Sequence, residues 1–174
     1  DLTVLYLAVP SLSEQLRPSG SQLLWIMDVY GFILAALLIP AGRLGDRIGR
    51  RRLLVIGAVL FGLASLAAAF STSAGWLIFA RAMMGVGGAT LMPSTLALIR
   101  TTFTDEQQRD RAIGLWTAAF AAGGALGPVV AGGLLEFFPW GSVFIINAPV
   151  VVLLLLGLRL WVAESRAETP APLP

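Results

Sequence analysis

Residues 42–51 read Gly-Arg-Leu-Gly-Asp-Arg-Ile-Gly-Arg-Arg and place five charged side chains and three glycines between two long apolar runs. The apolar runs cover residues 25–39 and 53–70, and Arg52 extends the basic cluster. A cluster this basic must stay in water or among lipid headgroups, and the positive-inside rule assigns it to the cytoplasm. The segment therefore predicts a chain that crosses a membrane on both sides of it.

The composition favours an all-α membrane protein over a soluble domain. Of the 174 residues 57% are hydrophobic and 13% are charged, and the mean hydropathy is +0.83. Soluble domains have roughly 25% charged and 45–50% apolar residues. Several apolar runs reach the ~20 residues that a helix needs to cross a bilayer. We therefore predict a helical protein that crosses the membrane several times.

The residue types that the sequence lacks narrow its chemistry. It has no cysteine and no histidine, and all twelve of its cationic side chains are arginine. This excludes disulfides, thiol chemistry, imidazole proton relays and histidine-ligated metals, so we expect no metal and no other cofactor. No nucleophile and base stand in a recognisable pattern, which argues against an enzyme. The net charge of +2 does not indicate nucleic-acid binding, because the arginines cluster in loops beside the membrane.

Hydropathy and turn signals predict six spanning segments, at about residues 1–12, 22–44, 53–70, 76–99, 112–137 and 142–162. We expect residues 1–162 to form a six-helix bundle whose first helix begins upstream of residue 1. Residues 163–174 are expected to begin a proline-rich cytoplasmic linker. Polar connections are expected at residues 13–21 and 71–75 on the outer side, and at residues 43–52 and 100–111 on the inner side.

The distribution of arginines tests this topology. Among the outer loops only residues 13–21 carry an arginine, Arg17, and Arg81 lies within the fourth segment. The other ten belong to the inner loops and the C-terminal end: Arg43, Arg47, Arg50, Arg51, Arg52, Arg100, Arg109, Arg111, Arg159 and Arg166. Such a bias is a positive-inside pattern and predicts a cytoplasmic C-terminal end.

Four charged residues fall inside the predicted spans: Asp1, Asp28, Arg81 and Glu136. A charge at the bilayer centre costs ~2.5–3.5 kcal/mol even on the lenient insertion scale, so such residues usually have a function. Asp28 lies roughly 9 Å below the outer end of its segment, at 1.5 Å per residue. A carboxylate there can exchange a proton for a cationic ligand, since burial favours its neutral form and a cation its charged form.

Each of these charges also has a structural interpretation. For Asp1 and Asp28 the alternative, which we favour less than a functional role, is a buried ion pair that assembles the bundle. Arg81 is expected close to Asp1, because segments 1 and 4 are equivalent in a three-plus-three inverted repeat, although a simple helix-packing contact is an equal alternative. Glu136 can reach the outer interface. An adaptable cavity, or alternatively ordinary packing, is expected from Tyr6, Trp25, Tyr30, Glu136 and the methionines Met27, Met83, Met84 and Met92.

The fifth segment has a nearly bare backbone along one face. Gly123 and Gly127 are four residues apart, and Gly132 and Gly133 follow Pro128. Small residues at this spacing allow close helix contact in membranes, and the proline allows a bend. A phosphate-binding loop is excluded, because these glycines lie in an apolar span without a strand or a lysine.

On these motifs the chain resembles the major facilitator superfamily. Its signature between the second and third helices is matched at Gly42, Gly45, Asp46, Arg47, Gly49, Arg50 and Arg51. Arg81 with Gly85 and Gly88 is similar to the fourth-helix motif of drug/proton antiporters, and residues 123–133 are similar to their fifth-helix antiporter motif. Residues 24–30 and 140–149 resemble the fourteen-span branch, including its quaternary-ammonium and dye efflux pumps. One departure is Gly141-Ser142, where many members have Arg-Trp.

The resemblance implies export of lipophilic, often cationic, compounds in exchange for protons across a bacterial cytoplasmic membrane by alternating access. Asp1 and Asp28 match the acidic positions for protonation and cation recognition, and Asp46 with its arginines matches a conformational latch against a second, C-terminal half. That half is expected to make the whole protein at least twice as long. Export of one endogenous metabolite by the same fold, or a membrane scaffold without transport, are the alternatives.

Overall fold

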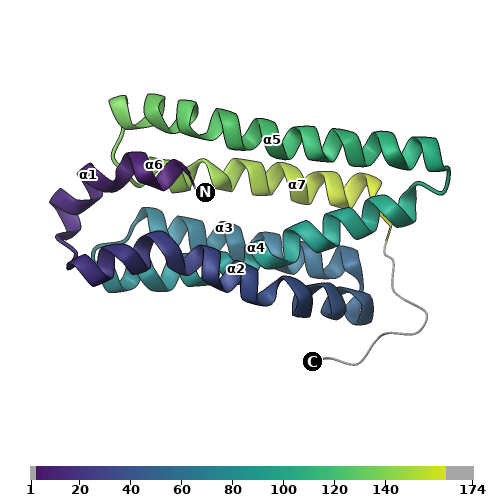
Figure 1. Ribbon diagram of the computed structural model, residues 1–174, viewed down its shortest axis with the longest axis horizontal. Helices are drawn as coiled ribbons and strands as arrows, with labels where there is room; N and C mark the ends of the chain where they lie inside the picture. Colours follow the sequence, from purple (N-terminus) through teal and green to yellow (C-terminus); the bar gives the residue numbers. More distant parts are fainter. Residues whose placement is uncertain (1–2, 164–174) are drawn as a thin grey trace.

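The computed structural model describes residues 3–163, and in that part all regular structure is helical (Figure 1). The helices are α1 (Val4–Leu16), α2 (Gly20–Ile48), α3 (Arg50–Ala69), α4 (Ala74–Thr102), α5 (Glu106–Phe137), α6 (Ser142–Ile145) and α7 (Asn147–Trp161). Within residues 3–163, five spans are long and apolar enough to cross a membrane, with α6 and α7 counting as one. These helices lie side by side along one axis, which confirms the predicted all-α membrane bundle.

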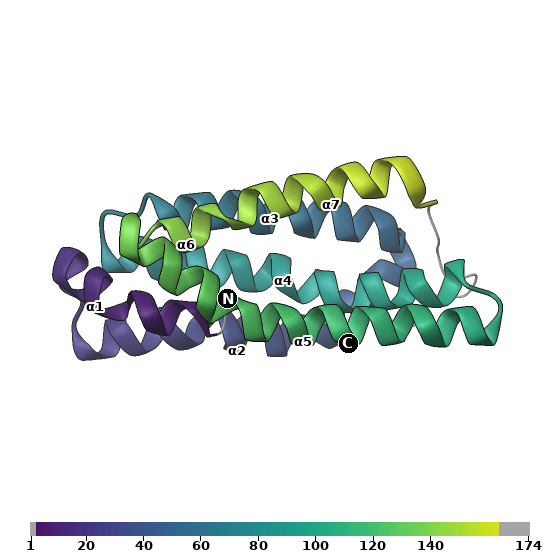
Figure 2. The same cartoon turned by 90° about the horizontal axis from the view of Figure 1, so that it is seen from above.

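Small residues on α4 set the packing of the bundle. A Cβ atom added at Gly85 would lie 2.9 Å from the carbonyl oxygen of Tyr30 on α2. One added at Gly87 would lie 2.7 Å from the carbonyl oxygen of Gly57 on α3. Helices α2 and α3 therefore approach two faces of α4 at backbone contact, the arrangement that glycine permits in membranes. Figure 2 shows α2, α3 and α4 running alongside one another.

The basic segment between the second and third spans is helical, and our expectation of a loop at residues 43–52 was wrong. Helix α2 continues to Ile48, and α3 begins at Arg50. The break is Gly49, whose φ of 107° lies in the region that favours glycine. The backbone hydrogen bonds of a helix do not depend on whether its side chains lie in the membrane or in water. Helix α2 therefore continues through the polar residues and ends only where Gly49 turns the chain.

The other polar connections are also shorter than predicted. Helix α1 extends to Leu16, and α5 begins at Glu106 rather than near residue 112. Asp105 starts α5 by accepting a hydrogen bond from the backbone N–H of Gln108 at 2.9 Å. Side-chain capping of this kind satisfies an N–H group that has no partner within the helix. Capping residues, rather than hydropathy, decide where these helices begin.

The sixth span is interrupted at Ile146, between α6 and α7. Pro149 has no N–H group, so the carbonyl of Ile145 lacks its usual helical partner. Nearby, the Ser65 hydroxyl on α3 donates to the Phe144 carbonyl at 2.7 Å, and the Asn147 amide donates to the Ser65 hydroxyl at 2.9 Å. This short polar network fastens the interruption to α3.

Replacing Gly87 by Ala should lower the free energy of unfolding by about 1–3 kcal/mol, the usual cost of overpacking. The new methyl group would meet backbone atoms of Gly57 and Phe61, neither of which can rotate away. The measurement is thermal unfolding of the purified full-length protein in detergent. Gly75→Ala on the same helix is the control, because no atom lies within 4 Å of its added Cβ. Equal stability of the two variants would contradict backbone contact at Gly87.

Candidate functional site

Arg81 joins α4 to α2 inside the bundle. Only 1% of its surface is exposed. Its Nε donates to the carbonyl of Ile26 at 3.0 Å, and its Nη2 donates to the carbonyl of Met27 at 3.2 Å. Its Nη1 is buried and has no hydrogen-bond partner among the described residues. The arginine thus holds α2 at the two residues that precede Asp28.

An aromatic ring completes the surroundings of Arg81. The guanidinium carbon lies 5.0 Å from the centre of the Tyr30 ring, within the range of a cation–π interaction. Tyr30 is buried and packs edge-on against Phe61 of α3. The structure therefore places the Tyr30 ring at the helix contact around Arg81, which is the packing alternative that the sequence left open beside a cavity.

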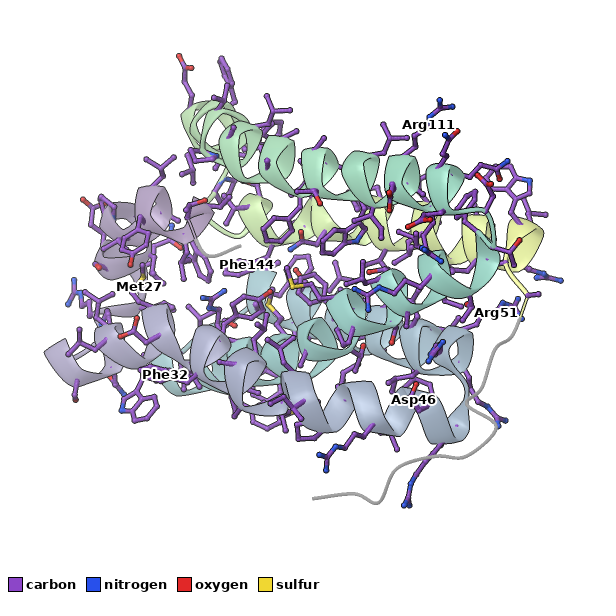
Figure 3. The ribbon with its side chains drawn as sticks, turned by 45° about the vertical axis from the view of Figure 1, so that its right-hand side comes forward. Met27, Phe32, Asp46, Arg51, Arg111 and Phe144 are labelled. Atoms are coloured by element: carbon purple, nitrogen blue, oxygen red, sulfur yellow. The ribbon has the colours of Figure 1, made fainter. Side chains whose placement is uncertain are left out.

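Asp28 lies on the exposed surface of α2, away from this packed interior. Trp25 and Phe32 stand three and four residues from it, on the same helix face. Their side chains are 52% and 62% exposed, and their rings meet edge to face with centroids 6.3 Å apart. Figure 3 shows Phe32 on the outer side of α2. An exposed carboxylate thus shares one face of an apolar helix with two exposed aromatic side chains.

This arrangement has the chemistry of a cation-binding site. A carboxylate supplies negative charge, and aromatic faces attract quaternary ammonium groups. Phe32 was missed in the sequence analysis, although its position four residues after Asp28 was the available signal. The described residues contain no group of three acidic side chains that could hold a metal ion.

The remaining predicted charge partners are not brought together within the described residues. Asp1 lies outside them, so its expected proximity to Arg81 stays a prediction. Among the described residues Arg81 donates its hydrogen bonds to two backbone carbonyls. Glu136 and Tyr6 are exposed, on α5 and α1 respectively, whereas Met84 is fully buried on α4.

The glycines of α5 fall into two groups. A Cβ atom added at Gly127 would lie 3.1 Å from Val4 of α1, so this glycine lies at a close helix contact. Gly123, Gly132 and Gly133 have no atom within 4 Å of an added Cβ. Gly123 and Gly127 both line a cavity of about 330 Å³ between α1, α5, α6 and α7, whose lining is almost wholly apolar. Pro128 is half-buried beside this contact.

The residues predicted to form a latch lie near the C-terminal end of α2 and the start of α3, where Figure 3 shows Asp46. One carboxylate oxygen of Asp46 accepts from Arg50 Nη2 at 2.8 Å and from Arg50 Nε at 3.1 Å. This pair borders a cavity of about 170 Å³ whose lining includes Gly42, Gly45 and Pro93. Gly49 lies between the two paired residues, so the ion pair joins the end of α2 to the first residue of α3.

Comparisons with known proteins agree with this geometry. The family model of the Major Facilitator Superfamily matches residues 1–174. The multidrug efflux pump LfrA of Mycolicibacterium smegmatis is 55% identical over 173 residues, which are 99% of this chain and 34% of that protein. The methyl viologen resistance protein SmvA of Salmonella typhimurium is 53% identical over 158 residues, which are 91% of this chain and 32% of that protein. The puromycin resistance protein pur8 of Streptomyces alboniger is 39% identical over 166 residues, which are 95% of this chain and 33% of that protein. The chain spans about a third of the length of these relatives.

Replacing Tyr30 by Leu should destabilise the full-length protein more than Tyr30→Phe, by about 1–2 kcal/mol. Phenylalanine keeps the ring that faces the Arg81 guanidinium, whereas leucine removes it. The measurement is thermal unfolding in detergent, repeated in an Arg81→Met background as a double-mutant cycle. The difference between the two variants should shrink there. An unchanged difference would assign the effect to lost volume and contradict the cation–π contact.

Proposed function

This chain belongs to the Major Facilitator Superfamily, and from that premise we propose that it is the N-terminal half of a proton-coupled exporter of lipophilic cations. The protein is a multi-pass protein of the bacterial cytoplasmic membrane, as its spanning helices and its efflux-pump relatives indicate. The relatives named above are a multidrug efflux pump and two resistance proteins, which supports drug export. Transport proceeds by alternating access, with residues 1–162 as one of two bundles.

The observation that supports the proposal is the exposed carboxylate of Asp28 on the same face of α2 as the exposed, mutually contacting rings of Trp25 and Phe32. Placing that charge against lipid would cost ~2.5–3.5 kcal/mol. This face of α2 therefore lies against a water-accessible cavity or against the rest of the transporter. A cation with an apolar body fits such a site, because the rings contact its body and the carboxylate balances its charge.

The coupling follows from competition for one negative charge. In the outward-facing state Asp28, Asp1 or both take up protons from outside, and the cation leaves. In the inward-facing state proton loss restores the anionic site, which binds the next cation. Arg81 acts on this site from behind, because it fixes the backbone of α2 at the two residues before Asp28.

The cytoplasmic end of α2 supplies the latch in this proposal. The Asp46–Arg50 pair is partly exposed beside its cavity, so the pair is accessible to a helix end of the C-terminal half. A helix N-terminus carries partial positive charge and suits a carboxylate such as Asp46. Contact there closes the cytoplasmic side, and release of the contact opens it.

Replacing Asp28 by Asn should abolish export of a cationic dye by the full-length protein, because the variant has neither the charge nor the proton site. The measurement is dye efflux from energised cells at equal membrane abundance, with and without a proton uncoupler. The uncoupler should lower wild-type efflux to the level of the variant. Asp105→Asn is the control and should retain efflux, because asparagine also caps a helix. Efflux by the Asp28 variant at the wild-type rate would refute the proposal.

The same assay separates a multidrug exporter from an exporter of one endogenous metabolite. Chemically unrelated cations should compete with the dye in the first case only. Absence of competition would therefore favour the single-metabolite alternative while leaving the fold and the coupling intact.

Phe32→Leu and Trp25→Leu should each raise the KM for a quaternary ammonium substrate roughly 2- to 30-fold, the range of one cation–π interaction. The KM for a neutral lipophilic substrate should change little, because the leucine preserves apolar contact. The control is Phe79→Leu, which alters the exposed Trp76–Phe79 pair on α4, a pair with no carboxylate between its members. Equal effects on charged and neutral substrates would show that the rings supply only apolar surface.

A further inference from the structure

We propose that Ser94 on α4 is a further residue of the latch, and that its hydroxyl accepts a hydrogen bond from the N-terminus of a helix of the C-terminal half. The second acceptor in this contact is the carboxylate of Asp46 on α2. Both residues line the cavity of about 170 Å³ between α2 and α4, which we call the Asp46–Ser94 pocket. The inference rests on the proposed function, whose latch it extends to a second helix.

The hydroxyl of Ser94 has no hydrogen-bond partner among the described residues, although the residue is only 3% exposed. Hydroxyl groups elsewhere on α4 bond to the backbone of their own helix. Thr90 Oγ1 donates to the carbonyl of Gly87 at 2.8 Å, and Thr95 Oγ1 donates to that of Leu91 at 2.7 Å. Buried polar groups in proteins are nearly always hydrogen-bonded. The partner of Ser94 must therefore come from outside the described part of the chain.

The Ser94 hydroxyl is directed toward α2. A Cβ atom added at Gly45 would lie 3.9 Å from Ser94 Oγ, and one added at Gly42 would lie 3.8 Å from the Cβ atom of Pro93. Side chains in place of these two glycines would therefore fill the space between α2 and α4. Because both positions are glycine, that space stays open as the Asp46–Ser94 pocket.

The Asp46 carboxylate offers a second acceptor at the same pocket. Both hydrogen bonds from Arg50 end on its Oδ1 atom, at 2.8 and 3.1 Å. Its Oδ2 atom accepts no hydrogen bond within the described residues, and 35% of the side chain is exposed. The pocket thus presents one charged and one neutral oxygen, from two different helices, to a partner that carries hydrogen-bond donors.

The first N–H groups of a helix match these two oxygens. The first four N–H groups of an α-helix have no acceptor within the helix, and they carry partial positive charge. Asp46 disfavours a free anion and Arg50 a free cation, whereas a helix N-terminus brings donors without a full charge. A helix with its side chains is about 10–12 Å across, so a pocket of about 170 Å³ takes only the tip of the helix.

The acceptor on α4 changes what the latch can do. A latch formed by Asp46 alone would hold the helix end at one point on α2. With Ser94 the helix end is held at two points, on α2 and on α4, while the cytoplasmic side is closed. The free N–H groups at a helix start belong to successive residues around the helix axis. Two acceptors therefore also restrict the rotation of the docked helix.

The test measures how well the closed state protects this pocket in the full-length protein. Ala97→Cys, in a cysteine-free background, reports access from the cytoplasm, because Ala97 lines the pocket and is partly exposed. Inside-out membrane vesicles are treated with a membrane-impermeant maleimide. Adding Ser94→Ala should speed labelling roughly 2- to 10-fold, the effect of one lost hydrogen bond on the closed state. Thr101→Val is the control and should label like the parent, because the Thr101 hydroxyl bonds to the backbone of α4 itself.

A double-mutant cycle ties Ser94 to the latch. In an Asp46→Ala background Ser94→Ala should change labelling little further, because both residues hold the same helix end. Full additivity would assign the effect to local packing and overturn the proposal. Labelling of the Ser94→Ala variant at the parent rate would show that the pocket holds only water and would also overturn it. Labelling does not depend on the exported compound, so a failure of cationic dye efflux would refute the proposed substrate without affecting this test.

Discussion

The bundle depends on backbone contact between α4 and its two neighbours. A bilayer offers no hydrophobic force between helices, because lipid tails are as apolar as leucine, so association relies on close packing and polar contacts. Gly85 and Gly87 allow α2 and α3 to approach α4 at van der Waals distance. That approach is also what lets Arg81 reach the carbonyls of α2. The position of the Arg81 charge therefore depends on the close packing of the helices, and a larger side chain at Gly85 or Gly87 would disturb both.

Much of the fold could be predicted because hydropathy reports directly on contact with lipid. The spans and the all-α class follow from that signal. The helix limits do not: Ile48 extends α2 and Glu106 begins α5, since hydrogen bonds within a helix do not depend on side-chain polarity. The hydrogen bonds from Arg81 to α2 could not be predicted either, because backbone carbonyls have no signature in a sequence pattern. Phe32 was predictable in principle from its spacing to Asp28.

The two charged residues of the candidate site differ in their exposure. Arg81 is enclosed and bonded to backbone, whereas Asp28 is exposed beside two aromatic rings. The buried cation holds the backbone of α2, whereas the exposed anion is the group that meets a ligand in the proposed function. Helix α5 is also largely exposed, since Ala131 is its one buried residue among those described. The rest of a longer transporter can cover this exposed surface.

The single residue between α2 and α3 has a mechanical consequence. Because only Gly49 separates them, the two helices cannot move apart at their cytoplasmic ends. A tilt of α2 would therefore move the start of α3 with it, and the hydrogen bond from Arg51 to Leu158 would pass that displacement on to α7. Three helices are thus mechanically coupled through one glycine and one hydrogen bond.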